Sequence, residues 1–139
     1  MLRAILSVIA GVVTWMIIAT AGNLVLRSAW AGYAAVESTM EFSPAMMVSR
    51  LVLGAAASIG SGIVGAWISR GSRRAVGILA AILLLFFVPV HYRLWDKFPV
   101  WYHAVFLISL VVLTVIGGML YRSRREIAGS AAPDRSAGS

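Results

Sequence analysis

Two histidines and the acidic residues near them are the side chains best suited to chemistry. His91 and His103 flank a short segment that contains Asp96, and Glu37 and Glu41 precede the second apolar stretch. Two imidazoles and a carboxylate are adequate ligands for Zn²⁺ and would also serve as a proton relay. However, their spacing matches no common metal-ligand motif, and the neighbouring Trp and Tyr are typical of a membrane interface. We therefore predict an interfacial anchor and no metal site, with His91, His103 and Asp96 as the only candidate ligands.

Arg50 is the charge that lies deepest in an apolar stretch. It follows the helix-start pair Ser43-Pro44 by about two helical turns. Two interpretations remain open. The charged head reaches the lipid phosphates while its stem lies in hydrocarbon, or it pairs with Glu37 or Glu41 and fixes the preceding loop. A predicted polar and aromatic cluster at this interface comprises His91, Trp95, Asp96, Trp101, His103 and Arg50.

Other motifs for chemistry are absent or misplaced. Residues 60–65 have the spacing of the G-x-G-x-x-G dinucleotide motif, but that motif requires a strand-to-helix turn and an acidic residue about 20 positions on. Here it lies inside an apolar stretch, and residues 83–87 are leucines and phenylalanines. Ser61 lacks the G-x-S-x-G frame of a nucleophile. The chain has no cysteine, which excludes disulfides and thiolate sites. We predict no enzyme and no cofactor.

Four long apolar stretches carry or flank these residues. The chain has 139 residues, of which 60% are hydrophobic and 12% charged, and its mean hydropathy is +0.90. A soluble domain of this size cannot bury so much apolar surface, whereas a helix of about 20 apolar residues crosses a bilayer. We predict an all-α fold: one four-helix transmembrane domain over residues 1–125, with spans at about 4–26, 45–69, 75–92 and 100–121. Residues 126–139 are predicted to form a disordered cytoplasmic tail.

The basic residues predict the orientation. One side of the predicted bundle carries eight of them against two acidic residues: Arg3, Arg70, Arg73, Arg74, Arg122, Arg124, Arg125 and Arg135 against Glu126 and Asp134. The other side carries four against three: Arg27, Arg50, Arg93 and Lys97 against Glu37, Glu41 and Asp96. Basic residues in short loops stay in the cytoplasm, so both termini are predicted to be cytoplasmic. The net charge of +7 then reflects orientation and not nucleic-acid binding.

The start of the chain allows a second interpretation. Arg3 followed by an apolar run resembles a signal peptide, and residues 19–21 and 29–31 fit the small-x-small cleavage pattern. The apolar run is longer than the roughly 7–15 residues of a signal core. We therefore predict that the first span is retained, with cleavage as the alternative.

The second stretch is rich in small residues at four-residue spacing. Gly54, Ser58, Gly62 and Ala66 form one line, and Ala57, Ser61 and Gly65 form a neighbouring one. Small residues let helix backbones approach closely within lipid. We predict that this helix lies at the centre of the bundle, with a contact between copies of the chain as the alternative. The third stretch, with residues 83–87, is predicted to face mainly lipid.

Aromatic residues gather on the predicted outer side. They are Trp30, Tyr33, Phe42, Tyr92, Trp95, Phe98, Trp101 and Tyr102, and Trp and Tyr favour the headgroup layer. The block Leu94-Trp95-Asp96-Lys97-Phe98-Pro99-Val100-Trp101-Tyr102-His103, followed by an apolar run that ends at Gly117-Gly118, resembles a group of uncharacterised small bacterial four-span integral membrane proteins. The resemblance implies the four-span fold and a bacterial inner membrane. It implies no activity and no site residues.

The predicted function follows from the absence of ionisable residues at the centres of the predicted spans. An ionisable group at mid-membrane costs about 2.5–3.5 kcal/mol, and the span centres have none, which argues against a proton pump or coupled transporter. We predict a non-enzymatic membrane protein that packs with itself or within a larger complex, its one certain partner being the lipid bilayer. The alternative is a channel or carrier for a small neutral or hydrophobic solute. Such a pathway would require one cavity lined by Thr14, Ser58, Ser61, Ser109 and Thr114.

Overall fold

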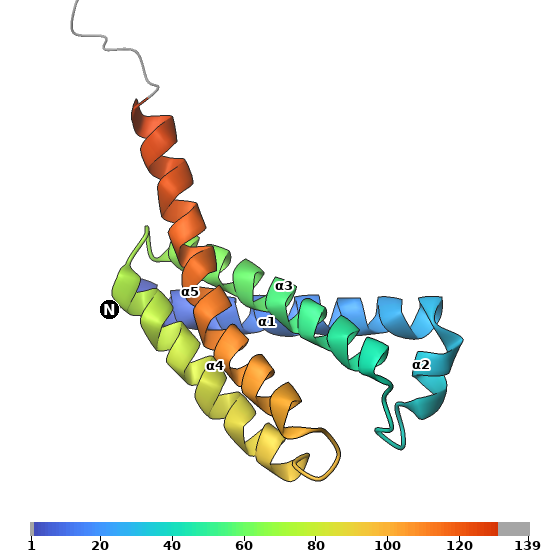
Figure 1. Ribbon diagram of the computed structural model, residues 1–139. Coiled ribbons are helices and arrows are strands. Elements are labelled where there is room, and N and C mark those ends of the chain that lie inside the picture. The colour runs from blue at the N-terminus through green and yellow to red at the C-terminus, as the bar shows by residue number, and fades with distance from the viewer. Residues whose placement is uncertain (1, 131–139) are drawn as a thin grey trace, which may run out of the picture.

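The computed structural model describes residues 2–130, and the regular structure of this part of the chain is entirely helical, with no strand (Figure 1). The elements of the described part are α1 (Leu2–Ala29), α2 (Ala31–Val36), α3 (Pro44–Ile68), α4 (Arg73–Arg93) and α5 (Val100–Ser130). Four of these helices, all except α2, are long and apolar enough to cross a membrane. The predicted all-α fold with four apolar helices is thus confirmed, and α2 is an element that the sequence pattern did not predict.

Serine side chains begin two of the long helices. Ser43 accepts a hydrogen bond from the backbone N–H of Met46, and Pro44 occupies the first turn of α3. Ser72 accepts a bond of 3.3 Å from the backbone N–H of Ala75 at the start of α4. Each cap satisfies one of the amide groups that a helix start leaves without a partner. The two starts are therefore determined locally, by short polar side chains.

The turn between α3 and α4 is tight because two residues adopt positive φ angles. Arg70 has φ 56° and Gly71 has φ 86°. The Gly71 N–H donates to the carbonyl of Ala66 at 2.7 Å, which closes the end of α3 in the manner of a Schellman motif. The Arg125 side chain of α5 donates to the carbonyl of Arg70 at 3.4 Å. The turn is thereby attached to α5.

Helix α5 is longer than the predicted span of 100–121. It continues to Ser130 and so includes the first residues of the predicted tail, while residues 131–139 lie outside the described part of the chain. Residues 122–128 contain no Gly or Pro and are mostly good helix formers, so nothing in this segment ends the helix. Figure 1 shows the carboxyl-terminal part of α5 projecting beyond the other helices.

Helix α3 lies between α1 and α5 (Figure 1), and its small residues are the contact surface. A Cβ atom placed at Gly62 would overlap the carbonyl oxygen of Thr114, and one at Gly117 would overlap the carbonyl oxygen of Ile59. Backbone thus packs directly on backbone between α3 and α5. All seven residues of the predicted stripe are buried within the monomer: Gly54, Ala57, Ser58, Ser61, Gly62, Gly65 and Ala66.

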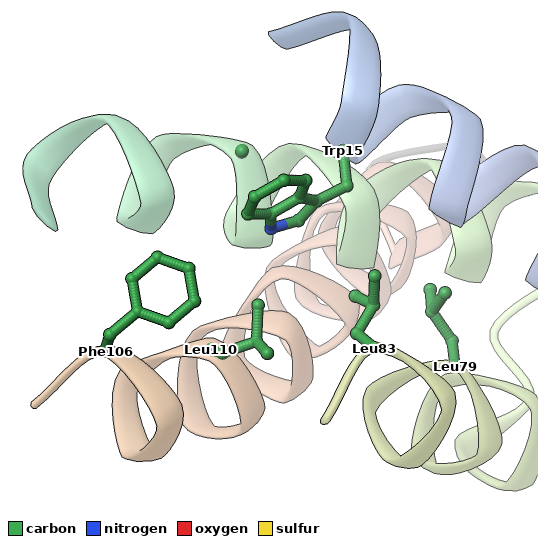
Figure 2. Packing of buried hydrophobic residues seen from close by; sticks show 6 residues of the cluster. Trp15, Leu79, Leu83, Phe106 and Leu110 are labelled. Carbon is green, nitrogen blue, oxygen red and sulfur yellow. The ribbon is translucent and has the colours of Figure 1, made fainter. Parts of the chain in front are cut away.

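Two clusters of buried side chains complete the core. The first joins the four long helices and consists of Trp15, Ala57, Leu79, Leu83, Phe106 and Leu110. Figure 2 shows the Trp15 indole directed from α1 towards side chains of α4 and α5. The second consists of Tyr33, Phe42, Met46, Met47, Phe98 and Tyr102. The prediction that residues 83–87 face lipid is wrong for Leu83, which is only 2% exposed because it packs in the first cluster, whereas Leu85 and Phe86 are exposed.

The bundle therefore has two distinct ends. The aromatic end consists of α2, the loop to α3 and the turn between α4 and α5 (residues 94–99), and the second cluster lies beneath it. The arginine end consists of the start of α1, the turn between α3 and α4, and α5 from Arg122 onwards.

Candidate functional site

A cavity of about 160 Å³ opens between the four long helices towards the aromatic end. All four helices contribute to its walls: Trp15, Ala19 and Asn23 from α1, Arg50, Leu53 and Gly54 from α3, Phe87, Val90 and His91 from α4, and Tyr102 and Phe106 from α5, with Leu94 and Phe98 from the turn. The wall is mostly aromatic and aliphatic. Its polar groups are one guanidinium, one imidazole, one amide and one phenol.

Arg50 is held in the wall by a chain of hydrogen bonds that leads to the connection between α1 and α3. Its Nη1 donates to the Tyr33 hydroxyl at 2.6 Å, and that hydroxyl donates to Asn23 Oδ1 at 2.7 Å. The Asn23 amide in turn donates to Glu37 at 2.9 Å, and Arg27 pairs with the other oxygen of Glu37 at 2.9 Å. The predicted direct pairing of Arg50 with Glu37 or Glu41 is therefore not observed. Glu37 already has two partners, and Tyr33 takes its place beside Arg50.

Within residues 2–130, no acidic side chain forms an ion pair with Arg50, and the nearest acidic residue of the hydrogen-bond chain, Glu37, is paired with Arg27. The guanidinium carbon lies 4.7 Å from the centre of the Phe42 ring, and the buried Tyr102 also interacts with it. Its Nε is buried and has no hydrogen-bond partner in the described chain. Arg50 is thus a half-buried cation that is balanced only by neutral phenols and a ring face.

His91 and His103, which were predicted to lie at similar depths, form a direct pair. Their Nδ1 atoms are 2.7 Å apart, and the side chains are buried. Because both atoms are ring nitrogens, one must carry a proton and the other must be unprotonated. The Trp95 ring stacks on His103 with a centroid distance of 4.9 Å, and Phe106 packs against His91 at 4.5 Å. The pair therefore joins α4 to α5 within an aromatic shell.

This geometry does not suit a metal ion. Two nitrogen ligands at 2.0–2.1 Å from a tetrahedral zinc would be about 3.3 Å apart, which is longer than the observed 2.7 Å. Asp96, the third candidate ligand, is exposed, and residues 2–130 contain no group of three His, Cys, Asp or Glu that could hold a metal. The structure thus brings His91 and His103 together as a hydrogen-bonded pair and leaves Asp96 exposed.

Seven of the eight predicted outer aromatic residues divide into two sets, and the eighth, Trp30, is partly buried and packs against the second cluster. Trp95 and Trp101 are about half exposed, and Tyr92 is 80% exposed, as expected for side chains at an interface. The other set is buried and forms the second cluster with two methionines: Tyr33, Phe42, Phe98 and Tyr102. A signal for this burial exists in part, since Tyr102 lies one turn before the buried Phe106 on the same face of α5, whereas Phe98 lies in the turn before this helix. No local signal indicates that Tyr33 would be fully buried.

The small polar residues of the spans do not line the cavity. Ser61 donates to the carbonyl of Gly11 at 2.8 Å, and Thr114 donates to the carbonyl of Leu110 at 2.7 Å. Ser58 accepts a bond of 3.1 Å from the Trp15 indole. These hydroxyl groups are bonded inside the helix contacts, so they do not form the polar pathway that a channel would require.

Comparison of the chain with models of known protein families, with curated proteins and with solved structures finds no match. The resemblance of residues 94–118 to bacterial four-span proteins therefore stays a prediction, and the function must be argued from the chemistry of the cavity.

Proposed function

We propose that this chain is a four-span integral membrane protein, non-enzymatic, that binds a small anion with an apolar body in the cavity beside Arg50. In this proposal both termini are cytoplasmic and the cavity faces the outer side of the membrane. The arginine asymmetry of the sequence supports this orientation. The resemblance of residues 94–118 implies that the membrane is a bacterial inner membrane.

One observation carries the binding proposal: Arg50 is a half-buried cation in a cavity wall without a carboxylate partner among the described residues. A charge that is partly removed from water is costly unless it is paired. Here the hydrogen-bond chain through Tyr33 and Asn23 holds the guanidinium in place and leaves its charge uncompensated. A ligand carboxylate would supply the missing negative charge.

The size and walls of the cavity specify the rest of the ligand. A cavity of about 150 Å³ with apolar walls is large enough for benzene, and this one measures about 160 Å³. Rings of Trp15, Phe87 and Phe106 line it. The favoured ligand therefore has one carboxylate and an apolar portion about as large as a benzene ring. Benzoate is the simplest probe of this class.

The remainder of the bundle supports binding over transport. Beyond the cavity, towards the arginine end, Gly62 and Gly117 bring the backbones of α3 and α5 into direct contact. No space for a solute path remains between these two helices at that level. The small-residue stripe is also used within the monomer, so self-association, if it occurs, would use the exposed faces of the bundle.

Thermal unfolding of the full chain in detergent tests the proposal. We expect 10 mM benzoate to raise the melting temperature by about 3 °C, as a millimolar ligand of the folded state should. Benzamide, which has the same ring and no charge, should have no effect. Arg50→Gln should abolish the response to benzoate, whereas Arg93→Gln, the matched loss of an exposed arginine outside the cavity, should preserve it.

A second variant covers the case in which Arg50→Gln does not fold. Ala19→Leu keeps the Arg50 contacts and adds three carbons to the cavity wall, so it should also abolish the response. Equal shifts with benzoate and benzamide, or a full response in Ala19→Leu, would refute binding in this cavity. The orientation is tested separately by a reporter fused after Arg125, which we expect to be active in the cytoplasm.

A further inference from the structure

A groove at the arginine end, between α4 and α5, is distinct from the cavity beside Arg50. It has a volume of about 290 Å³ and is lined by Arg73, Val76, Gly77, Val115, Met119 and Arg122. Figure 1 shows α4 and α5 side by side here, with α5 continuing past the start of α4. No acidic residue lines the groove.

Each of the two helices lines the groove with apolar residues and an arginine about one turn beyond them. On α4, Arg73 precedes Val76 and Gly77 by three and four positions, so all three lie on one face. On α5, Arg122 follows Met119 by three positions, with the same result. Both arginines therefore lie about one helical turn beyond an apolar floor. This arrangement places positive charge at headgroup level and apolar surface at acyl-chain level.

The groove has free space at position 77, where glycine has no side chain. A Cβ atom built at Gly77 would have no atom of another residue within 4 Å. This glycine therefore differs from Gly62 and Gly117, whose missing side chains permit helix contact. In a bilayer an open groove of this kind is filled by lipid chains.

The turn between α3 and α4 contacts two arginine side chains of α5 near the groove. The stem of Arg122 lies against Gly71, and Arg125 donates to the carbonyl of Arg70. A second hollow, of about 370 Å³, adjoins the groove at Arg122 and is lined by Arg70, Gly71, Arg122, Arg125 and Glu126. Three arginines against one glutamate keep this hollow positive. The start of α4 also favours an anion.

We infer that the groove binds an anionic glycerophospholipid, with the phosphate between Arg73 and Arg122 and one acyl chain on the floor formed by Val76, Gly77 and Met119. Basic pockets between helices at a membrane surface are suited to such headgroups. The inference rests on the four helices crossing a bilayer, which is part of the proposed function, and it is independent of the cavity beside Arg50.

Native mass spectrometry of the detergent-solubilised full chain tests the inference with phosphatidylglycerol and phosphatidylcholine of identical acyl chains. We expect at least tenfold tighter binding of phosphatidylglycerol. Arg73→Gln combined with Arg122→Gln should remove this preference, whereas Arg3→Gln combined with Arg74→Gln, an equal loss of charge outside the groove, should preserve it.

Two further arms distinguish a lipid site from a phosphate site. Gly77→Leu, which fills the groove without changing charge, should weaken the binding of both lipids at least fivefold. Soluble glycerol phosphate should bind at least tenfold more weakly than phosphatidylglycerol. Equal binding of the two lipids, equal effects of the two double variants, or full lipid binding by Gly77→Leu would overturn the inference. A chain that inserts in membranes and responds to benzoate, yet shows no lipid preference, would refute this inference alone.

Discussion

The two ends of the bundle are packed in different ways, by backbone contact at one end and by aromatic side chains at the other. Towards the arginine end, glycines bring the backbones of α3 and α5 together, and the charged side chains remain at the surface. Towards the aromatic end, rings of Tyr33, Phe42 and Tyr102 fill the space between the helices, and the charge of Arg50 lies among them. Backbone contact leaves no room between α3 and α5 at this level, whereas ring packing leaves the cavity beside Arg50.

This difference separates two kinds of positive charge. In the proposed membrane orientation, the surface arginines would act through their number in each loop. Arg50 is held by specific partners, and its position depends on the path of the loop that carries Tyr33. The fixed position of its guanidinium therefore supports the proposed role of Arg50 in ligand recognition.

The largest effect is expected where backbone meets backbone. Gly62→Ala places a Cβ against the Thr114 carbonyl, an atom that cannot move without shifting α5. We expect a loss of about 3 kcal/mol in unfolding free energy, at the upper end of the usual cost of overpacking. Unfolding of the purified chain in mixed detergent micelles would measure it.

Gly77→Ala is the matched control for this comparison. It makes the same chemical change in a helix where the new methyl group meets no neighbour. Alanine is the better helix former by about 1 kcal/mol, so the variant should be as stable as the original chain or slightly more so. Similar losses for both glycines would mean that α3 and α5 are not in close contact.

A smaller effect is expected at the aromatic end from Arg50→Ala. The change removes the hydrogen bond to Tyr33 and the contact with the Phe42 ring, and a hydrogen bond to a charged group is worth about 2 kcal/mol. Melting in detergent should show this loss. Arg93→Ala, at the exposed end of α4, should change stability by less than about 0.5 kcal/mol. An unchanged melting temperature for Arg50→Ala would mean that the hydrogen-bond chain does not fix the loop.

The helices themselves could be predicted from the sequence because their causes are local. Apolar length specifies the four long helices, and Ser43-Pro44 places the start of α3 at the observed residue. The predicted span ends at Tyr121, whereas α5 continues to Ser130, because the charged residues after Tyr121 suggest a membrane boundary but do not end a helix. Membrane boundary and helix boundary are different properties, and only the first depends on hydropathy.

The partners of the site residues could not be predicted, because they depend on how the connections fold. Opposite charge made Glu37 the obvious partner for Arg50, yet α2 brings the Tyr33 hydroxyl to Arg50 and leaves Glu37 with Arg27. For the two histidines, the sequence indicated a shared depth. It contained no information on whether their rings would meet, which requires the relative rotation of α4 and α5.

The smallest expected effect is the coupling between His91 and His103, and it tests whether the aromatic end is held by specific polar contacts as well as by rings. His91→Leu removes one partner and leaves a buried nitrogen of His103 without its bond, and His103→Leu does the converse. Each single variant should lose about 2 kcal/mol of unfolding free energy. The double variant removes both polar groups together, so its loss should be smaller than the sum of the single losses by about 1 kcal/mol. Strict additivity would show that the two rings contribute only by packing, and the difference between the two ends would then be one of side-chain volume alone.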